Sequence, residues 1–71
     1  MSTEILAPMA GKIVRIDIEA GATLFEDQEI LFIEAMKMET PIYAPCDGVI
    51  EKFLKKVGDD VEEDDLIAIM E

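Results

Sequence analysis

Apolar and polar residues alternate with a period of two along short stretches of this chain. Val14, Ile16 and Ile18 are each followed by a charged residue, which is the pattern of a strand that buries one face. The runs EILFIEA (residues 29–35) and LIAIM (residues 66–70) are rich in isoleucine and too short for helices, so they also predict strands. Glycine and proline residues separate these stretches and predict turns between them.

The chain repeats itself after a shift of 37 residues. The identical pairs include Thr3 and Thr40, Ala7-Pro8 and Ala44-Pro45, Gly11 and Gly48, Ile13 and Ile50, and Gly21 and Gly58. Because the glycine and proline positions recur in register, chance similarity in an isoleucine-rich chain is a poor explanation. We therefore interpret the sequence as two copies of one half-domain.

The repeat predicts an all-β fold with four strands in each half. Each half presents an apolar face that it cannot bury alone, and packing the two faces together removes both from water. The economical arrangement is a flattened eight-stranded barrel or sandwich with an internal pseudo-two-fold axis, which also protects the sheet edges. We expect residues 1–71 to form a single domain of this kind.

Lys37 lies at the join between the two copies, in the sequence EAMKMET (residues 34–40). The chain has to turn back there as a hairpin, and a two-fold axis would place this hairpin at one pole of the domain and both termini near the other. The predicted turn is centred on Met36 and Lys37, although two-residue turns favour Asn-Gly or Gly-X because their central residues take positive φ. Its pairing sets Glu34 against Glu39, a like-charge pair that costs roughly 0.2–1 kcal/mol. Violations of local rules such as these tend to mark functional sites.

Composition restricts the classes of partner. The chain has 17 acidic and 6 basic residues and a net charge of -11, so nucleic acid and anionic membranes would repel it. No run approaches the ~20 apolar residues of a membrane span, and the N-terminus lacks the pattern of a secretory signal. The single cysteine, Cys46, has no partner for an intrachain disulfide, and we interpret it as a small core residue in a reducing compartment. The sequence thus predicts a cytoplasmic protein.

Side chains suited to catalysis are scarce. Without histidine the chain lacks Ser-His-Asp and Cys-His arrangements and the commonest zinc ligand. Residues 59–65 (DDVEEDD) are rich in carboxylates, but they lack the glycine and the spacing of an EF-hand calcium loop, so we interpret them as a solvated acidic turn. A protonated lysine is a poor nucleophile. Lys37 therefore suits the role of an acceptor, to which another enzyme delivers an activated group. The alternative is that Lys37 is an ordinary surface lysine and that the methionines beside it belong to the core, and the exposed tip and the two methionines argue against it.

The segment EAMKMET resembles the biotin-attachment motif Ala-Met-Lys-Met of biotinyl domains, the domains of biotin carboxyl carrier proteins. The repeat, the Ala-Pro-x-x-Gly segments and the acidic turns extend the resemblance over nearly the whole chain. It implies a flattened barrel of two four-stranded antiparallel sheets, with biotin linked through an amide to Lys37 on an exposed hairpin. It also implies that Met36 and Met38 flank the modified lysine, and that Ala35 and Glu34 complete the surface read by the modifying ligase.

The resemblance further implies a non-catalytic carrier with three kinds of partner: a biotin protein ligase, a biotin carboxylase and a carboxyltransferase. Biotin would shuttle a carboxyl group between the active sites of a biotin-dependent carboxylase or decarboxylase that acts on an acyl-CoA or an oxoacid. The chain lacks an insertion like the thumb of some acetyl-CoA carboxylase carriers, and it is either a free-standing carrier or a domain trimmed from a longer protein. Two other functions stay open: a lipoyl domain, whose lysine usually lacks methionines on both sides, and an acidic interaction module that binds calcium.

Overall fold

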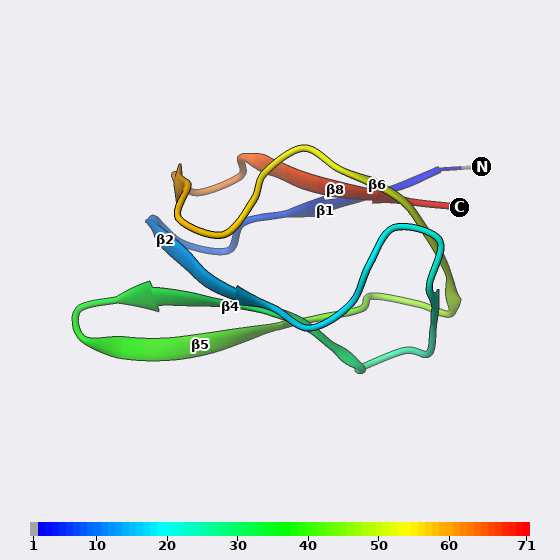
Figure 1. Cartoon of the computed structure of the whole chain (residues 1–71), viewed down its shortest axis with the longest axis horizontal. Coiled ribbons are helices and arrows are strands. Elements are labelled where there is room, and N and C mark those ends of the chain that lie inside the picture. Colours follow the sequence, from blue (N-terminus) through cyan, green and yellow to red (C-terminus); the bar gives the residue numbers. More distant parts are fainter. Residues whose placement is uncertain (1) are drawn as a thin grey trace.

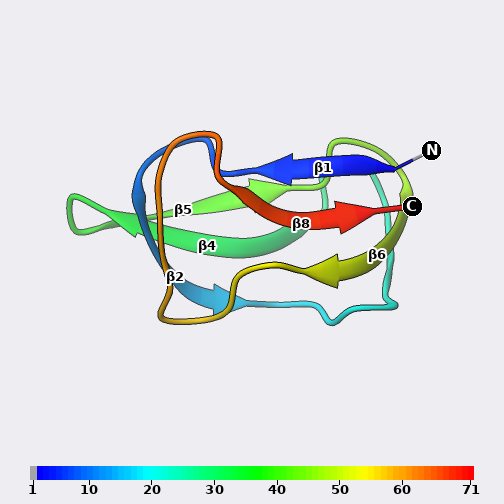
Figure 2. The same cartoon turned by 90° about the horizontal axis from the view of Figure 1, so that it is seen from above.

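The structure, a computed structural model, describes residues 2–71. These residues form eight strands and no helix, arranged as two four-stranded antiparallel sheets that pack face to face (Figures 1 and 2). The strands are β1 (Thr3–Leu6), β2 (Gly11–Ile16), β3 (Thr23–Leu24), β4 (Glu29–Ala35), β5 (Met38–Tyr43), β6 (Gly48–Phe53), β7 (Asp60–Val61) and β8 (Leu66–Met70). One sheet has the order β1-β8-β6-β3 and the other β5-β4-β2-β7. The predicted all-β fold is confirmed, and none of the described segments is a helix long and apolar enough to cross a membrane.

A pseudo-two-fold axis relates the two halves of the chain. Strands β1 to β4 correspond to β5 to β8, and replacing each strand by its counterpart turns one sheet order into the other. Hydrogen bonds repeat in the same way: Asp27 N–H donates to Ala44 O (2.8 Å), and Asp64 N–H donates to Ala7 O (2.7 Å). Each of these bonds joins one half to the other, so the copies are interlocked. The repeat in the sequence is therefore also a repeat in the structure.

Apolar side chains, most of them branched, fill the space between the sheets. The largest fully buried ones are Ile13, Leu24, Ile30, Leu31, Ile33, Ile50, Ile67 and Met70. The predicted alternation at residues 14–19 is present, since Val14, Ile16 and Ile18 are half-buried and the charged residues between them are exposed, but Ile13 is the residue of β2 that lies fully in the core. A register shift between Ile13 and Arg15, typical of a β-bulge, adds one residue to β2 there, so that Ile13 and Ile16 pair with the buried residues Ile33 and Leu31 although they are three positions apart.

Gly11 brings β2 close to the end of β4. A Cβ atom on Gly11 would lie 2.5 Å from Glu34 O and 2.5 Å from Ile33 Cγ2, closer than non-bonded atoms approach. A Cβ atom on its counterpart Gly48 would meet Glu71 O at 2.6 Å and the flexible end of a methionine side chain at 3.1 Å. The absence of a side chain lets the backbones pack at both positions, and Gly11 thereby fixes the part of β4 that leads into the hairpin.

We expect Gly11→Ala to lower the free energy of unfolding by roughly 2–3 kcal/mol, because an overpacked site between two paired strands relaxes poorly. Gly48→Ala should cost less, since only the Glu71 carbonyl, which accepts from Val49 N–H, is held in place there and the methionine end can move, whereas the Ile33 side chain that faces Gly11 is fully buried. Urea denaturation of the two variants and of the parent protein checks this order. Equal losses in both variants would contradict the tighter fit assigned to Gly11.

Candidate functional site

Strands β4 and β5 form a hairpin that projects from one end of the domain, opposite the chain ends (Figures 1 and 2). Ala35 pairs with Met38, so Met36 and Lys37 alone form the turn. Strand β2 pairs with β4 only as far as Glu34, which leaves residues 35–38 extending beyond the rest of the sheet. The predicted position of Lys37, at the pole opposite the termini, is confirmed.

The turn holds two residues in the left-handed region. Met36 has a φ of 55° and Lys37 a φ of 65°, as in a type I′ turn, where both central residues take positive φ. Neither is glycine or asparagine, and a side chain in this region costs about 1 kcal/mol per residue. The strain that the sequence predicts is therefore present, and the cross-strand pairs of β4 and β5 hold the turn closed against it.

The methionines beside Lys37 are exposed. Met36 exposes 95% of its surface and Met38 exposes 70%. Lys37 and Glu34 are exposed as well, and Ala35 is half-buried. A large apolar side chain in solvent contributes little to the free energy of folding, which excludes the interpretation of these methionines as core residues. Their flexible, polarizable side chains are instead available for contact with another molecule.

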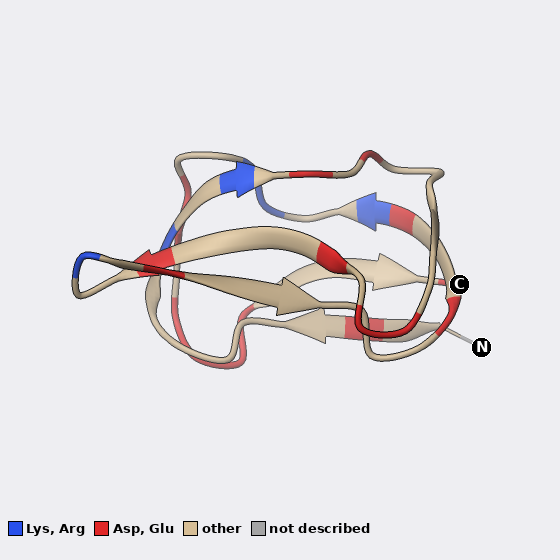
Figure 3. Cartoon of the chain, turned by 90° about the horizontal axis from the view of Figure 1, so that it is seen from below, with Lys and Arg blue, Asp and Glu red and all other residues tan. Residues whose placement is uncertain are grey.

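Two glutamates face each other behind the turn. Glu34 and Glu39 are cross-strand partners, as predicted, and Lys12 in β2 is the partner of Glu34 on its other side. Figure 3 shows acidic segments directly behind the basic tip of the hairpin. Among residues 2–71 the only salt bridge involves Arg15. The exposed amine of Lys37 is therefore not held in an ion pair by either glutamate.

The acidic segment 59–65 contains strand β7 and the turn that follows it. Glu62 N–H donates to Asp65 Oδ2 (2.8 Å) and Asp65 N–H donates to Glu62 O (3.0 Å), which closes the turn. The equivalent turn in the first half is closed in the same way by Gln28, whose Oε1 accepts from Phe25 N–H (3.0 Å). Over the part of the chain that is described, no group of three or more acidic or cysteine side chains is placed to hold a metal ion. A second carboxylate of the segment, Asp59, accepts from Lys56 N–H (3.0 Å), so two of its acidic side chains bond to backbone N–H groups.

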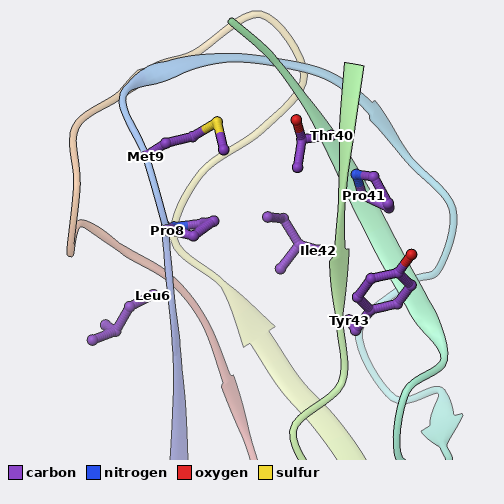
Figure 4. A pocket seen from close by; sticks show the side chains of 7 residues that line it. All are labelled: Leu6, Pro8, Met9, Thr40, Pro41, Ile42 and Tyr43. Atoms are coloured by element: carbon purple, nitrogen blue, oxygen red, sulfur yellow. The ribbon is translucent and has the colours of Figure 1, made fainter. Parts of the chain in front are cut away.

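An apolar groove lies beside the hairpin (Figure 4), with a volume of about 410 Å³. Its lining residues are Leu6, Pro8, Met9, Thr40, Pro41, Ile42 and Tyr43. They belong to β1, to the segment after it and to β5, so the groove lies between edge strands of the two sheets. Sequence reasoning missed this groove. A signal was present, since Leu6 and Tyr43 are equivalent in the repeat and both are apolar at positions that the strand period directs outward.

Comparison with known proteins identifies the family. A family model for biotin/lipoyl domains, described as "Biotin-requiring enzyme", matches residues 3–70. The chain belongs to the biotin/lipoyl-attachment family. It is a carrier module of the kind that biotin-dependent carboxylases contain, and the resemblance based on EAMKMET is confirmed at the level of the family.

Relatives of this biotin/lipoyl domain include one small protein and several large carboxylases. The domain is 39% identical over 59 residues to the biotin/lipoyl attachment protein of Bacillus subtilis (strain 168), which covers 83% of this chain and 81% of that protein. It is 39% identical over 69 residues, 97% of this chain, to pyruvate carboxylase of Staphylococcus aureus. It is 42% identical over 57 residues, 80% of this chain, to the mitochondrial methylcrotonoyl-CoA carboxylase subunit alpha of Oryza sativa. The chain spans only 6% of the length of the first carboxylase and 8% of the second.

Solved structures share the fold of this domain. Urea carboxylase of Kluyveromyces lactis matches with a TM-score of 0.92 and 28% identity, over 99% of this chain and 6% of that one. The lipoyl domain of the 2-oxoglutarate dehydrogenase complex from Azotobacter vinelandii matches with a TM-score of 0.81 and 27% identity, over 96% of this chain and 94% of that one. A carboxylase and a lipoyl domain therefore contain the same architecture, so the fold alone does not separate a biotin carrier from a lipoyl carrier.

We expect Met36→Asn to raise the free energy of unfolding by roughly 0.5–1 kcal/mol, because asparagine tolerates the left-handed region better than methionine does. Met38→Asn is the matched control, since Met38 is also exposed but is not among the described residues with positive φ. Urea denaturation of the two variants measures the difference. An equal rise in the free energy of unfolding in both variants would show that relief of strain in the turn is not its cause. No rise in either variant would show that the turn stores no strain that asparagine can relieve.

We expect calcium at constant ionic strength to leave the melting temperature unchanged. Any monovalent salt should raise it slightly by screening the acidic segment 59–65, since the screening length falls to ~8 Å near physiological ionic strength. A calcium site would instead give a saturable rise that follows RT ln(1 + [L]/Kd). Thermal melts of the parent, of Asp64→Asn and of Asp27→Asn in the equivalent turn provide the comparison. A saturable rise that only Asp64→Asn loses would support the calcium-binding alternative.

Proposed function

We propose that this protein is a biotin carboxyl carrier, with biotin attached covalently to Lys37. The observation that carries the proposal is an exposed lysine between two exposed methionines at the tip of a projecting hairpin, in a member of the biotin/lipoyl-attachment family. The residues fit the group: no ion pair with a described residue holds the amine, and the rest of the sheet ends before the turn.

Attachment requires Lys37 to act as a nucleophile toward an activated form of biotin. With a biotin protein ligase as partner, the neutral Lys37 amine attacks the carbonyl carbon of biotinyl-adenylate. An amide bond forms, the bond from that carbon to the AMP oxygen breaks, and the amine gives up a proton. The closed turn holds the amine clear of the domain while this happens. Met36 and Met38 provide apolar contact for the ligase, and Ala35 and Glu34 complete the surface that it reads.

This domain contributes to carboxyl transfer by carrying the cofactor from one active site to another, and it provides no catalytic group. When bound, biotin supplies a ureido nitrogen that accepts and releases a carboxyl group. The four-carbon stem of Lys37, at the end of a firmly paired hairpin, lets the cofactor visit two active sites while it stays tethered. Tethering makes each encounter intramolecular, with effective concentrations on the order of millimolar for a short flexible link.

The remaining partners follow from this role. One is a biotin carboxylase, which loads the carboxyl group, and the other is a carboxyltransferase, which removes it for an acyl-CoA or oxoacid substrate. In a decarboxylase system the donor of the carboxyl group would instead be the acyl-CoA or oxoacid itself. The similarity to proteins named pyruvate carboxylase and methylcrotonoyl-CoA carboxylase supports this class of partner.

A lipoyl carrier is the second candidate function. The lipoyl domain from Azotobacter vinelandii favours it, because that whole domain, and not a fragment of a larger enzyme, matches this chain. Lipoyl would form an amide with the same Lys37 amine. The methionines on both sides of the lysine favour biotin, since they complete the similarity to the biotin-attachment motif.

We expect the purified protein, incubated with a biotin protein ligase, ATP and biotin, to gain one biotinyl group. Lys37→Arg should gain none, because arginine keeps the charge but offers no amine for the amide bond. Lys12→Arg is the matched control: Lys12 is also exposed and lies in the strand beside the hairpin, and its replacement should leave labelling intact. Streptavidin blotting and intact mass measure the product.

Two outcomes would change the assignment. Full labelling of Lys37→Arg would refute Lys37 as the acceptor. An unlabelled parent protein that a lipoate ligase modifies at Lys37 would move the assignment to the lipoyl carrier.

A further inference from the structure

The methionines among residues 2–71 fall into two classes. Met70 is 1% exposed and lies in the core, and Met9 is partly buried against the core. Met36 is 95% exposed and Met38 is 70% exposed, one on each side of Lys37. Within the described segment, highly exposed thioethers therefore occur only where the modifying enzyme has to contact the chain.

An exposed thioether is the form of methionine that peroxide reaches most readily. Hydrogen peroxide transfers one oxygen atom to the sulfur: the sulfur loses two electrons, the O–O bond breaks and water leaves, so no further reactant is needed. Methionine sulfoxide reductases reverse the step with two thiols, which become a disulfide while the oxygen leaves as water. Burial keeps peroxide away from Met70, so oxidation should concentrate on the hairpin.

Oxidation at these two positions would alter recognition and leave the fold intact. A sulfoxide is polar, so the apolar contact surface beside the lysine becomes a polar one. Neither side chain belongs to the core, and backbone pairing between β4 and β5 holds the turn closed. The reaction also leaves the Lys37 amine unchanged.

We propose that Met36 and Met38 form a reversible oxidation site, at which conversion to sulfoxides by peroxide blocks attachment of the cofactor to Lys37. This inference rests on the proposed function, because it concerns access of the ligase to Lys37. The oxidised carrier stays folded and unmodified until a reductase restores the thioethers. The fraction of the carrier that receives the cofactor thereby depends on the relative rates of oxidation by peroxide and of repair by the reductase.

Besides the thioethers of methionine, peroxide attacks the thiol of Cys46. Its thiol is half-buried in the loop between β5 and β6, with Sγ 4.0 Å from Thr3 Oγ1. Replacing this thiol separates its oxidation from that of the thioethers. Cys46→Ser, which retains a polar group next to Thr3, is therefore the background in which the proposal is tested.

The test compares peroxide-treated and untreated Cys46→Ser protein. Peptide mapping by mass spectrometry should find sulfoxide at Met36 and Met38 before Met9 or Met70, and the urea denaturation midpoint should stay unchanged. The initial rate of biotin attachment, measured with a biotin protein ligase after the peroxide is removed, should fall by about tenfold or more, which corresponds to losing the apolar burial of roughly one methionine side chain. Methionine sulfoxide reductase with a thiol should restore the rate.

The matched control carries Met36→Leu and Met38→Leu in the same background. Leucine has no sulfur and a similar volume, so the attachment rate of this variant, referred to its own untreated sample, should not respond to peroxide. An unchanged rate in the oxidised protein, an equal loss in the leucine variant, or preferential oxidation of Met9 or Met70 would each overturn the proposal. If the untreated protein accepts no biotin, the proposed function has failed before any oxidation, and this inference falls with it.

Discussion

The whole structure depends on burying one apolar core between two halves that cannot bury their inner faces alone. The equivalent residues Ile13 and Ile50 are both fully buried, one from each half, and the backbone hydrogen bonds made by Ala7 and Ala44 cross from one half to the other. A chain of 71 residues with a single cysteine has no intrachain disulfide to add stability, so mutual burial has to supply most of the driving force for folding. Neither half is a separate unit, and the axis between them sets the geometry of the domain.

The position of the functional hairpin follows from the same pseudo-two-fold axis. The connection between the two copies lies at the pole opposite the chain ends, as Figure 2 shows. The hairpin is anchored as far as Glu34, where β2 and β5 pair with β4 on either side, and beyond it the turn is exposed on a rigid base. This base can support positive φ at Met36 and Lys37, at a cost of about 1 kcal/mol each. A lysine on such a turn is held away both from the core and from anything joined to the termini.

Much of this architecture could be predicted from the sequence because its signals are periodic. The runs at residues 29–35 and 66–70 are the equivalent strands β4 and β8, and the 37-residue repeat predicts how the sheets correspond. The bulge at Ile13 could not be predicted, since it depends on the register of β2 against β4, which no local pattern records. The apolar groove was missed because it exists only once β1 and β5 come together from distant parts of the chain; the outward apolar residues Leu6 and Tyr43 indicate an exposed apolar surface, but they do not show that their strands are neighbours. At the site, the hairpin pattern was sufficient to predict the strained turn and the exposure of Met36 and Met38, because both follow from local geometry. The identity of the group on Lys37 depends on an encounter with a ligase, and it remains a prediction.

Mass spectrometry of the protein isolated from its native cells tests the assignment of Lys37 most directly. Intact mass reports which group the protein carries, and fragment mapping reports which residue carries it. We expect one biotinyl group, located on Lys37. A lipoyl group on Lys37, or biotin on any other lysine, would contradict the assignment.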